Sequence, residues 1–172
     1  SFSLGTDTAG SGRVPASFNN LLGYKPTRGK LSNRGIVPAC RTLDCVSVFG
    51  LQVSDIAEVL SVLEKWDPLD PFSRKVEEHT SCSHSETPKV ALLSDDLLDF
   101  FGDSMAQKAY QKSVDVLAKS GLDLHPVDLS PFLEAADLLY SGPWVAERHL
   151  ATSPLIKESP DSFLPELSLI HI

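Results

Sequence analysis

The chain has 172 residues, of which 42% are hydrophobic and 22% charged, and its formal net charge is −8. This composition is typical of a globular protein with one sizeable core. The acidic balance and the lack of a Lys/Arg cluster argue against a nucleic-acid-binding protein, and no apolar run is long enough to cross a bilayer.

The first part of the chain predicts short strands around a loop-rich stretch. Residues 2–5 are typical of a strand, and residues 13–20 predict a short helix. Residues 21–24 form a second apolar run. Residues 27–45 are rich in Gly, Pro, Ser, Asn and Arg, which indicates a loop with short strands. Residues 45–53 are apolar and β-branched, which predicts a buried strand.

A helix is expected next, with Ser54 as its N-cap. Apolar residues recur there at the i, i+3, i+4, i+7 spacing of one buried helical face. They are Ile56, Val59, Leu60 and Leu63, and Trp66 would extend the stripe. Residues 67–87 are polar and predict a surface excursion.

A strand–helix–strand–helix pattern occupies the second part. Residues 90–94 predict a buried strand, 104–120 a helix ended by Gly121, and 122–129 an outer strand. The packed side of the first helix is expected to use Ala109, Val114, Val116 and Leu117. A last helix is expected over 130–150. This order predicts an α/β protein with at least some parallel strands.

Cysteine and histidine usage gives no metal or disulfide signal. Cys40, Cys45 and Cys82 are odd in number and lack zinc spacing. His79 and His84 flank Cys82 in a serine-rich stretch without a second ligand pair, which favours a solvated loop over a metal site. No secretory signal is visible, so we expect reduced thiols and a cytoplasmic protein.

The most informative stretch is residues 3–16, where glycines and hydroxyls precede an expected helix. Gly10 and Gly12 bracket Ser11, so positive φ angles and close approach to a ligand are possible there. A hydroxyl beside unpaired N–H groups at a helix start can stabilise an oxyanion; phosphate binding and a turn without a chemical role are the alternatives. The spacing around Ser11 differs from the Gly-x-Ser-x-Gly elbow, which disfavours an α/β-hydrolase triad.

The letters of residues 5–16, Gly-Thr-Asp-Thr-Ala-Gly-Ser-Gly-Arg-Val-Pro-Ala, together with residues 20–29, resemble the amidase signature family. Residues 35–49 and 67–74 are similar to its allophanate hydrolase members, and the similarity reappears around residues 140–148. The resemblance implies an α/β fold with a mixed sheet core flanked by helices, present here as a fragment.

The resemblance also implies the roles of the site residues. Ser11 is the expected nucleophile, and its proton passes through a second serine, held by a cis peptide, to a neutral lysine. Both partners precede this sequence in the family order, so neither Lys25 nor Lys30 replaces that lysine. The expected oxyanion hole uses backbone N–H groups of Thr8, Ala9, Gly10 and Ser11. Asp7 and Arg13 are expected to hold the loop by hydrogen bonds and charge pairing.

A second site is expected at Tyr140 and Arg148, which lie close to two helical turns apart in sequence. Gly142 and Pro143 are expected to distort that helix. The segment resembles the Tyr-x-Gly-Pro-Trp-Val-Ala-Glu-Arg stretch of allophanate hydrolases, in which the tyrosine and arginine grip the substrate. An arginine fork matches a carboxylate. A solvated surface helix is the alternative interpretation.

The implied reaction is hydrolysis of allophanate, a small anionic substrate, to ammonia and carbon dioxide in urea degradation, without a metal or cofactor. A homodimer and fusion to a urea carboxylase both stay open. The alternatives are another amidase signature enzyme, such as the A-type component of an amidotransferase, or a non-catalytic fragment. We expect residues 1–166 to be a partial amidase domain that is inactive in isolation, and residues 167–172 to be the translation of a sequencing adapter.

Overall fold

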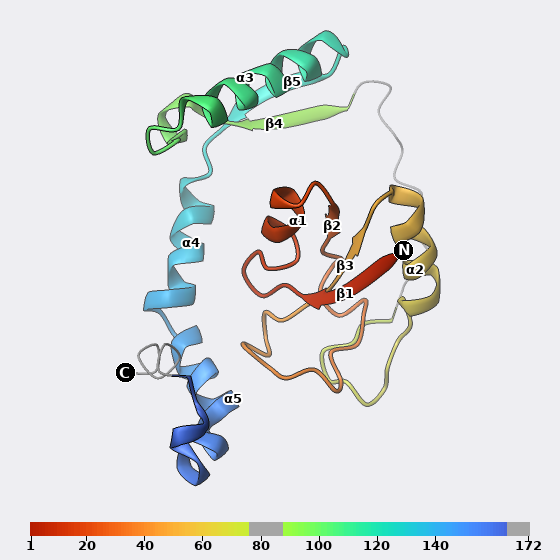
Figure 1. The fold of residues 1–172 in the computed structure, drawn as a ribbon, viewed down its shortest axis with the longest axis vertical. Coiled ribbons are helices and arrows are strands. Elements are labelled where there is room, and N and C mark those ends of the chain that lie inside the picture. The colour runs from red at the N-terminus through yellow and green to blue at the C-terminus, as the bar shows by residue number, and fades with distance from the viewer. Residues whose placement is uncertain (76–87, 165–172) are drawn as a thin grey trace. The chain divides into compact units, whose positions relative to one another are not determined.

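The computed structural model describes residues 1–75 and 88–164 (Figure 1). The chain divides into two compact units: the first comprises Ser1–Thr80 and Pro143–Ile172, and the second Ser81–Gly142. Within the described ranges, no helix combines the length and apolarity needed to cross a bilayer.

The first unit is built on a three-stranded antiparallel sheet in the order β1-β3-β2. The strands are β1 (Phe2–Thr6), β2 (Leu22–Tyr24) and β3 (Val46–Gly50). Gly5 of β1 pairs with Ser47 of β3. The central strand is almost wholly buried, as its β-branched sequence predicts, but it ends at Gly50, before the expected limit.

Helix α2 (Val53–Leu63) covers β3 and closes the core of the first unit. Val48, Ile56 and Val59 form the buried cluster, and Leu60 and Leu63 pack against it. The predicted apolar face of this helix is therefore confirmed.

Two expectations for α2 differ from the structure. The prediction that Ser54 caps α2 is wrong, because the N-cap is Gln52 and no side chain caps the helix. Trp66 does not extend the buried face, since it is 48% exposed. The Lys75 ammonium instead lies 4.8 Å from the centroid of the Trp66 ring.

Residues 25–45, which connect β2 to β3, form a connection without the expected short strands.

The second unit contains a parallel strand pair, β4 (Lys89–Leu93) and β5 (Asp123–Val127), with α3 (Ser104–Lys119) between them in sequence. Asp103 caps α3 by accepting hydrogen bonds from two backbone N–H groups, and Gly121 follows the helix with a φ of +76°. The predicted parallel pairing is confirmed. Parallel and antiparallel pairs lie in separate sheets rather than in one.

Burial in the second unit is lower than the sequence predicts. No residue of α3 is fully buried. Val114 and Leu117 are half-buried as expected, whereas Ala109 and Val116 are exposed, so these two assignments are wrong. Strand β4 is also not buried and consists of exposed and half-buried residues.

The single helix expected over 130–150 is two helices, α4 (Ser130–Ser141) and α5 (Trp144–Glu158). Gly142 is extended, with φ −115° and ψ −162°, and ends α4. Pro143, which lacks an N–H, is the N-cap of α5. The predicted distortion at this pair is a complete break. Helix α5 belongs to the first unit and α4 to the second.

Candidate active site

The serine loop, residues 7–13, connects β1 to α1 (Val14–Phe18) and exposes Ser11. Gly10 has a φ of +133°, which side chains with a Cβ rarely allow. Its carbonyl accepts hydrogen bonds from the N–H groups of Arg13 and Val14, each at 2.9 Å. These bonds form a tight turn that leads directly into α1, so the positive φ expected here is confirmed for Gly10.

Gly12 is required for a reason other than the predicted one. Its φ lies outside the left-handed region. A Cβ at this position would overlap the Cβ and Oγ of Ser47 on β3. Glycine therefore allows the serine loop to pack directly against the central strand.

Asp7 is the internal anchor of the serine loop. Its carboxylate is fully buried and accepts hydrogen bonds from the Gly10 N–H at 2.7 Å and from Arg13 Nε at 2.8 Å. Lys25 Nζ donates to it at 3.2 Å. Burial alone would raise the pKa of Asp7, but the hydrogen bonds from Arg13, Gly10 and Lys25 lower that pKa well below its usual value. The loop is thus held by a carboxylate that stays ionised, and the structural roles predicted for Asp7 and Arg13 are confirmed.

The same contacts account for two lysines that follow the serine loop in sequence. Lys25 pairs with Asp7, and Lys30 Nζ lies 3.6 Å from a carboxylate oxygen of Glu64. Each side chain is therefore engaged by a carboxylate within the first unit.

The backbone N–H groups of the serine loop differ in what they bind. The Gly10 N–H, one of the four expected oxyanion-hole donors, donates to the buried Asp7 carboxylate. For Thr8, Ala9 and Ser11, the part of the chain that the structure describes provides no acceptor for the backbone N–H. Three of the four expected donors are therefore available to bind a negatively charged oxygen.

Asp44, a residue outside the serine loop for which no role was expected, anchors this loop. Thr8 Oγ1 donates to Asp44 Oδ1 at 2.5 Å. The buried Asp44 carboxylate also accepts hydrogen bonds from the N–H groups of Ala39 and Cys40, each at 3.0 Å. Thr8 and Asp44 are 36 residues apart, and no local pattern signals that they meet.

Helix α5 is tied to the turn that contains Asp44. Glu147 accepts hydrogen bonds from the Thr42 N–H at 2.7 Å and from Thr42 Oγ1 at 2.6 Å. Arg148, the expected substrate ligand, is the next residue on α5 and is half-buried. The structure thus connects the Arg148 segment to the turn that holds Thr8.

Tyr140 and Arg148 do not share a helix. Tyr140 lies near the end of α4 in the second unit and is 70% exposed, whereas Arg148 lies on α5 in the first unit. The helical spacing argument that would place them on neighbouring faces is therefore wrong, because the chain breaks at Gly142 and Pro143.

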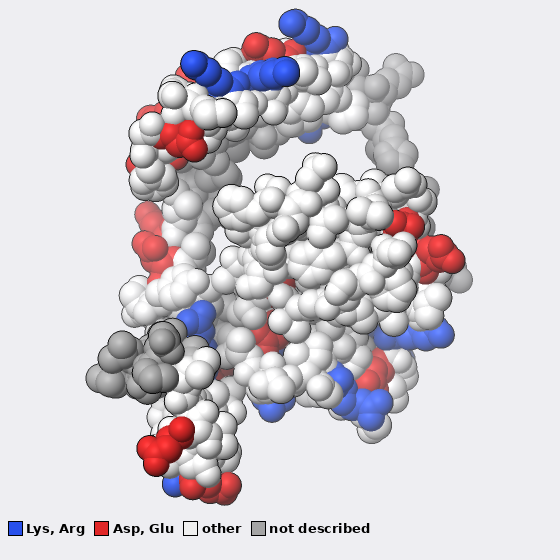
Figure 2. All heavy atoms as spheres, viewed as in Figure 1, with Lys and Arg blue, Asp and Glu red and all other residues white. Residues whose placement is uncertain are grey.

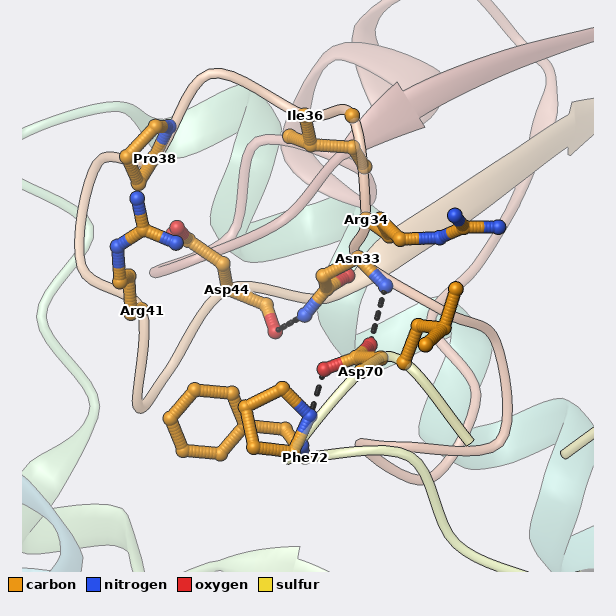
Figure 3. A pocket seen from close by; sticks show the side chains of 11 residues that line it. Asn33, Arg34, Ile36, Pro38, Arg41, Asp44, Asp70 and Phe72 are labelled. Carbon is orange, nitrogen blue, oxygen red and sulfur yellow. Dashed lines mark hydrogen bonds between the residues drawn. The ribbon is translucent and has the colours of Figure 1, made fainter. Parts of the chain in front are cut away.

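A pocket of about 250 Å³ lies beside Asp44 in the first unit. Figure 3 shows Asn33 between two acidic residues: its Nδ2 donates to the Asp44 carbonyl at 2.8 Å, and its N–H donates to Asp70 at 2.7 Å. Arg34 and Arg41 also line this pocket. The Arg34 guanidinium pairs with Asp67 at 3.0 Å. Ser11 does not line this pocket, so we assign the pocket no part in the chemistry of the serine loop.

The surface over α1 and β2 is uncharged on the face drawn in Figure 2. Large apolar side chains are exposed along these elements, namely Val14, Phe18, Leu21, Leu22 and Tyr24. The chain that leaves the serine loop therefore continues into an apolar surface.

The described ranges contain no group of three or more His, Cys, Asp or Glu side chains that could hold a metal. The expectations for His79, Cys82 and His84, and for residues 167–172, lie outside those ranges. Cys40 and Cys45 are buried and not disulfide-bonded. Burial raises the pKa of both thiols, which favours the protonated, unreactive form.

A protein-family model described as Amidase matches residues 1–166. Urea amidolyase of Lachancea kluyveri is 41% identical over 167 residues, which cover 96% of this chain and 9% of the relative. A mitochondrial glutamyl-tRNA(Gln) amidotransferase component of Candida albicans (strain WO-1), its A-type polypeptide, is 32% identical over 143 residues, which cover 82% of this chain and 32% of the relative.

Solved structures give the same result. Allophanate hydrolase of Kluyveromyces lactis matches with a TM-score of 0.89 and 44% identity, over 98% of this chain and 28% of that chain. Urea amidolyase of K. lactis matches with a TM-score of 0.90 and 42% identity, over 99% of this chain and 10% of that chain. The expected amidase-type α/β fold is confirmed, and this chain spans a minor part of each relative.

Proposed function

This chain belongs to the Amidase family, and from that premise we propose that the enzyme containing it hydrolyses allophanate to ammonia and carbon dioxide through an acyl-enzyme on Ser11. The observation that carries the proposal is the conformation of the serine loop. It leaves Ser11 exposed in the same short turn as the N–H groups of Thr8 and Ala9, for which the described residues provide no acceptor. The similarity to allophanate hydrolase and urea amidolyase supports this substrate.

In the proposed reaction, Ser11 Oγ attacks the carbon of the terminal amide of allophanate and forms a new C–O bond. The carbonyl oxygen becomes an oxyanion, for which the N–H groups of Thr8, Ala9 and Ser11 are the assigned donors. The C–N bond then breaks, and the nitrogen leaves as ammonia after it takes up a proton. Water attacks the resulting ester, restores the proton of Ser11 and releases N-carboxycarbamate. This product loses two molecules of carbon dioxide and leaves the second nitrogen as ammonia.

The proton of Ser11 needs an acceptor, because a serine hydroxyl is a weak nucleophile at its ordinary pKa. The resemblance assigns this role to a second serine and a neutral lysine that precede the nucleophile in the family order. Lys25 and Lys30 are paired with carboxylates, which supports leaving both out of the relay.

We assign the carboxylate of allophanate to Arg148, whose guanidinium can donate two parallel hydrogen bonds to it. Tyr140 is proposed as a second substrate contact through its hydroxyl. The similarity of residues 140–148 to allophanate hydrolases supports both assignments. An uncharged amide would gain nothing from Arg148, so this residue is the proposed determinant of substrate choice.

The second candidate is another amidase reaction, which the similarity to the glutamyl-tRNA(Gln) amidotransferase favours. The identity to urea amidolyase is higher and extends over more of this chain.

The similarity to urea amidolyase also supports the proposal that a urea carboxylase is fused to the amidase. A homodimer and a cytoplasmic location are proposals from the sequence alone.

The test measures ammonia release from allophanate by a full-length enzyme that carries this sequence. Ser11→Ala should lower the rate at least about 10⁴-fold, as removal of a catalytic nucleophile does. Ser17→Ala makes the same change on the exposed side of α1 and should leave the rate unaltered. If Ser11→Ala retains the wild-type rate, the proposal is wrong.

A further inference from the structure

The Glu147–Thr42 contact joins two parts of the chain that are 105 residues apart. Both oxygens of the Glu147 carboxylate are engaged, one by the backbone N–H and one by the hydroxyl of Thr42, at 2.7 and 2.6 Å. Two simultaneous bonds to one carboxylate fix orientation as well as distance. Neither residue has a role in the proposed reaction so far.

Thr42 lies in a closed turn rather than on a loose loop. The carbonyl of Cys40 accepts hydrogen bonds from the N–H groups of Leu43 at 2.9 Å and Asp44 at 2.7 Å. The Asp44 carboxylate binds back to the N–H of Cys40 at 3.0 Å and to Thr8 Oγ1 at 2.5 Å. A single short turn therefore holds the serine loop through Asp44 and helix α5 through Thr42.

The two bonds from Thr42 hold helix α5 directly at Glu147. In the described part of the chain, no residue of α5 is fully buried. Arg148 follows Glu147 directly, and consecutive helical residues keep a fixed rotation of about 100° and a rise of about 1.5 Å. A clamp on Glu147 consequently sets both the rotation and the height of α5 at Arg148.

We propose that Glu147 is a positioning residue that places Arg148 to bind the carboxylate of the substrate, by locking α5 onto the 40–44 turn that also holds Thr8 of the serine loop. This inference rests on the proposed function and adds to it a residue that determines specificity. It predicts that the clamp matters for binding a carboxylate and much less for the chemistry at Ser11.

The charge of Glu147 is suited to this task. Burial alone would raise the pKa of Glu147, but the two hydrogen bonds from Thr42 lower it below the usual value for a glutamate. The side chain therefore accepts both bonds as a carboxylate. An amide at this position could accept only one of them, because its NH₂ group is a donor.

The test compares steady-state kinetics on allophanate and on an uncharged amide, in a full-length enzyme carrying this sequence. Glu147→Gln should raise KM for allophanate about tenfold, as expected for a misplaced binding group, with kcat changed far less. Kinetics on the uncharged amide should stay close to wild type. Glu158→Gln makes the same change at the exposed end of α5 and serves as the matched control.

Thr42 provides an independent variant of the same contact. Thr42→Val removes the hydroxyl donor and should also raise KM for allophanate, whereas Thr42→Ser, which keeps it, should retain more of the wild-type affinity. The double variant Glu147→Gln with Thr42→Val should be little worse than either single variant, because both break one contact. Thermal unfolding of each variant reports whether it is folded.

Three results would overturn the inference: an unchanged KM in both single variants, equal losses on allophanate and the uncharged amide, or fully additive effects. Ser11→Ala separates this failure from that of the proposed function. If Ser11→Ala abolishes turnover while Glu147→Gln has no effect, only the role of Glu147 is wrong. If Ser11→Ala is active, the proposed reaction itself is wrong.

Discussion

The carboxylate of Asp7 and the guanidinium of Arg13 form a two-point contact beneath the serine loop, with Nε donating to Oδ2 at 2.8 Å and Nη2 to Oδ1 at 3.2 Å. Asp7 is shut off from solvent, while about half of the Arg13 side chain, 54%, is exposed. The buried partner is the one that cannot be removed without leaving charges uncompensated.

Asp7→Asn should therefore destabilise the protein and reduce activity. The amide can still accept the Gly10 N–H, but Arg13 and Lys25 lose their counter-charge. We expect the free energy of unfolding to fall by about 2 kcal/mol, a value reduced because Arg13 is partly solvated. Urea denaturation measures the change. Asp96→Asn, at an exposed position, should cost less than about 0.5 kcal/mol.

The same residue predicts how stability depends on pH. The pKa of Asp7 is lower in the folded protein than in the unfolded chain, so its contribution is complete above the unfolded value of about 3.9. The contribution is lost as the pH falls from there toward the lowered pKa. The stability difference between wild type and Asp7→Asn should thus be constant from neutral pH to about pH 5 and shrink below about pH 4. A difference that grows in acid would contradict this role.

Gly12→Ala should damage the serine loop through a steric clash. The new Cβ would overlap the side chain of Ser47 on the central strand, and a buried overlap of this kind costs about 1–3 kcal/mol. We expect lower stability together with a loss of kcat, because the loop must lift away from β3. Adding Ser47→Gly removes the overlapping atoms and should restore part of both. A Gly12→Ala enzyme with wild-type kcat would show that the loop tolerates displacement.

Arg148→Ala should separate the two candidate reactions. If Arg148 binds the carboxylate of allophanate, its removal should reduce kcat/KM for allophanate by about 10²-fold, as loss of a charged hydrogen-bonding partner does. Hydrolysis of an uncharged amide should change little. Arg74→Ala removes an arginine from another region of the first unit and controls for the loss of positive charge. Equal losses on both substrates would exclude a carboxylate-binding role.

The local features of the serine loop could be predicted from sequence because all of their parts are neighbours. The positive φ of Gly10 and the pairing of Asp7 with Arg13 involve residues at most six positions apart. The contacts of Asp44 and Glu147 join positions 36 and 105 residues apart. One sequence carries no periodic or local signal for such pairs, so their roles required the structure.

Burial was predicted well where one element covers another and poorly elsewhere. Ile56 and Val59 face β3, and their spacing predicted their burial. Ala109 and Val116 have the same apolar character, but they are exposed on α3, a helix of the second unit with no fully buried residue. The position of the break between α4 and α5 was predictable because Pro143 lacks an N–H. That the chain forms two separate helices there, rather than one distorted helix, was not predictable.

The most direct test of the account is to trap the acyl-enzyme. A full-length enzyme that carries this sequence is mixed with substrate, quenched in acid, digested and analysed by mass spectrometry. We expect an acyl adduct on the peptide that contains Ser11, at a level that rises with turnover, and no adduct in Ser11→Ala. An adduct on a different residue, or turnover with Ser11 replaced by alanine, would contradict it.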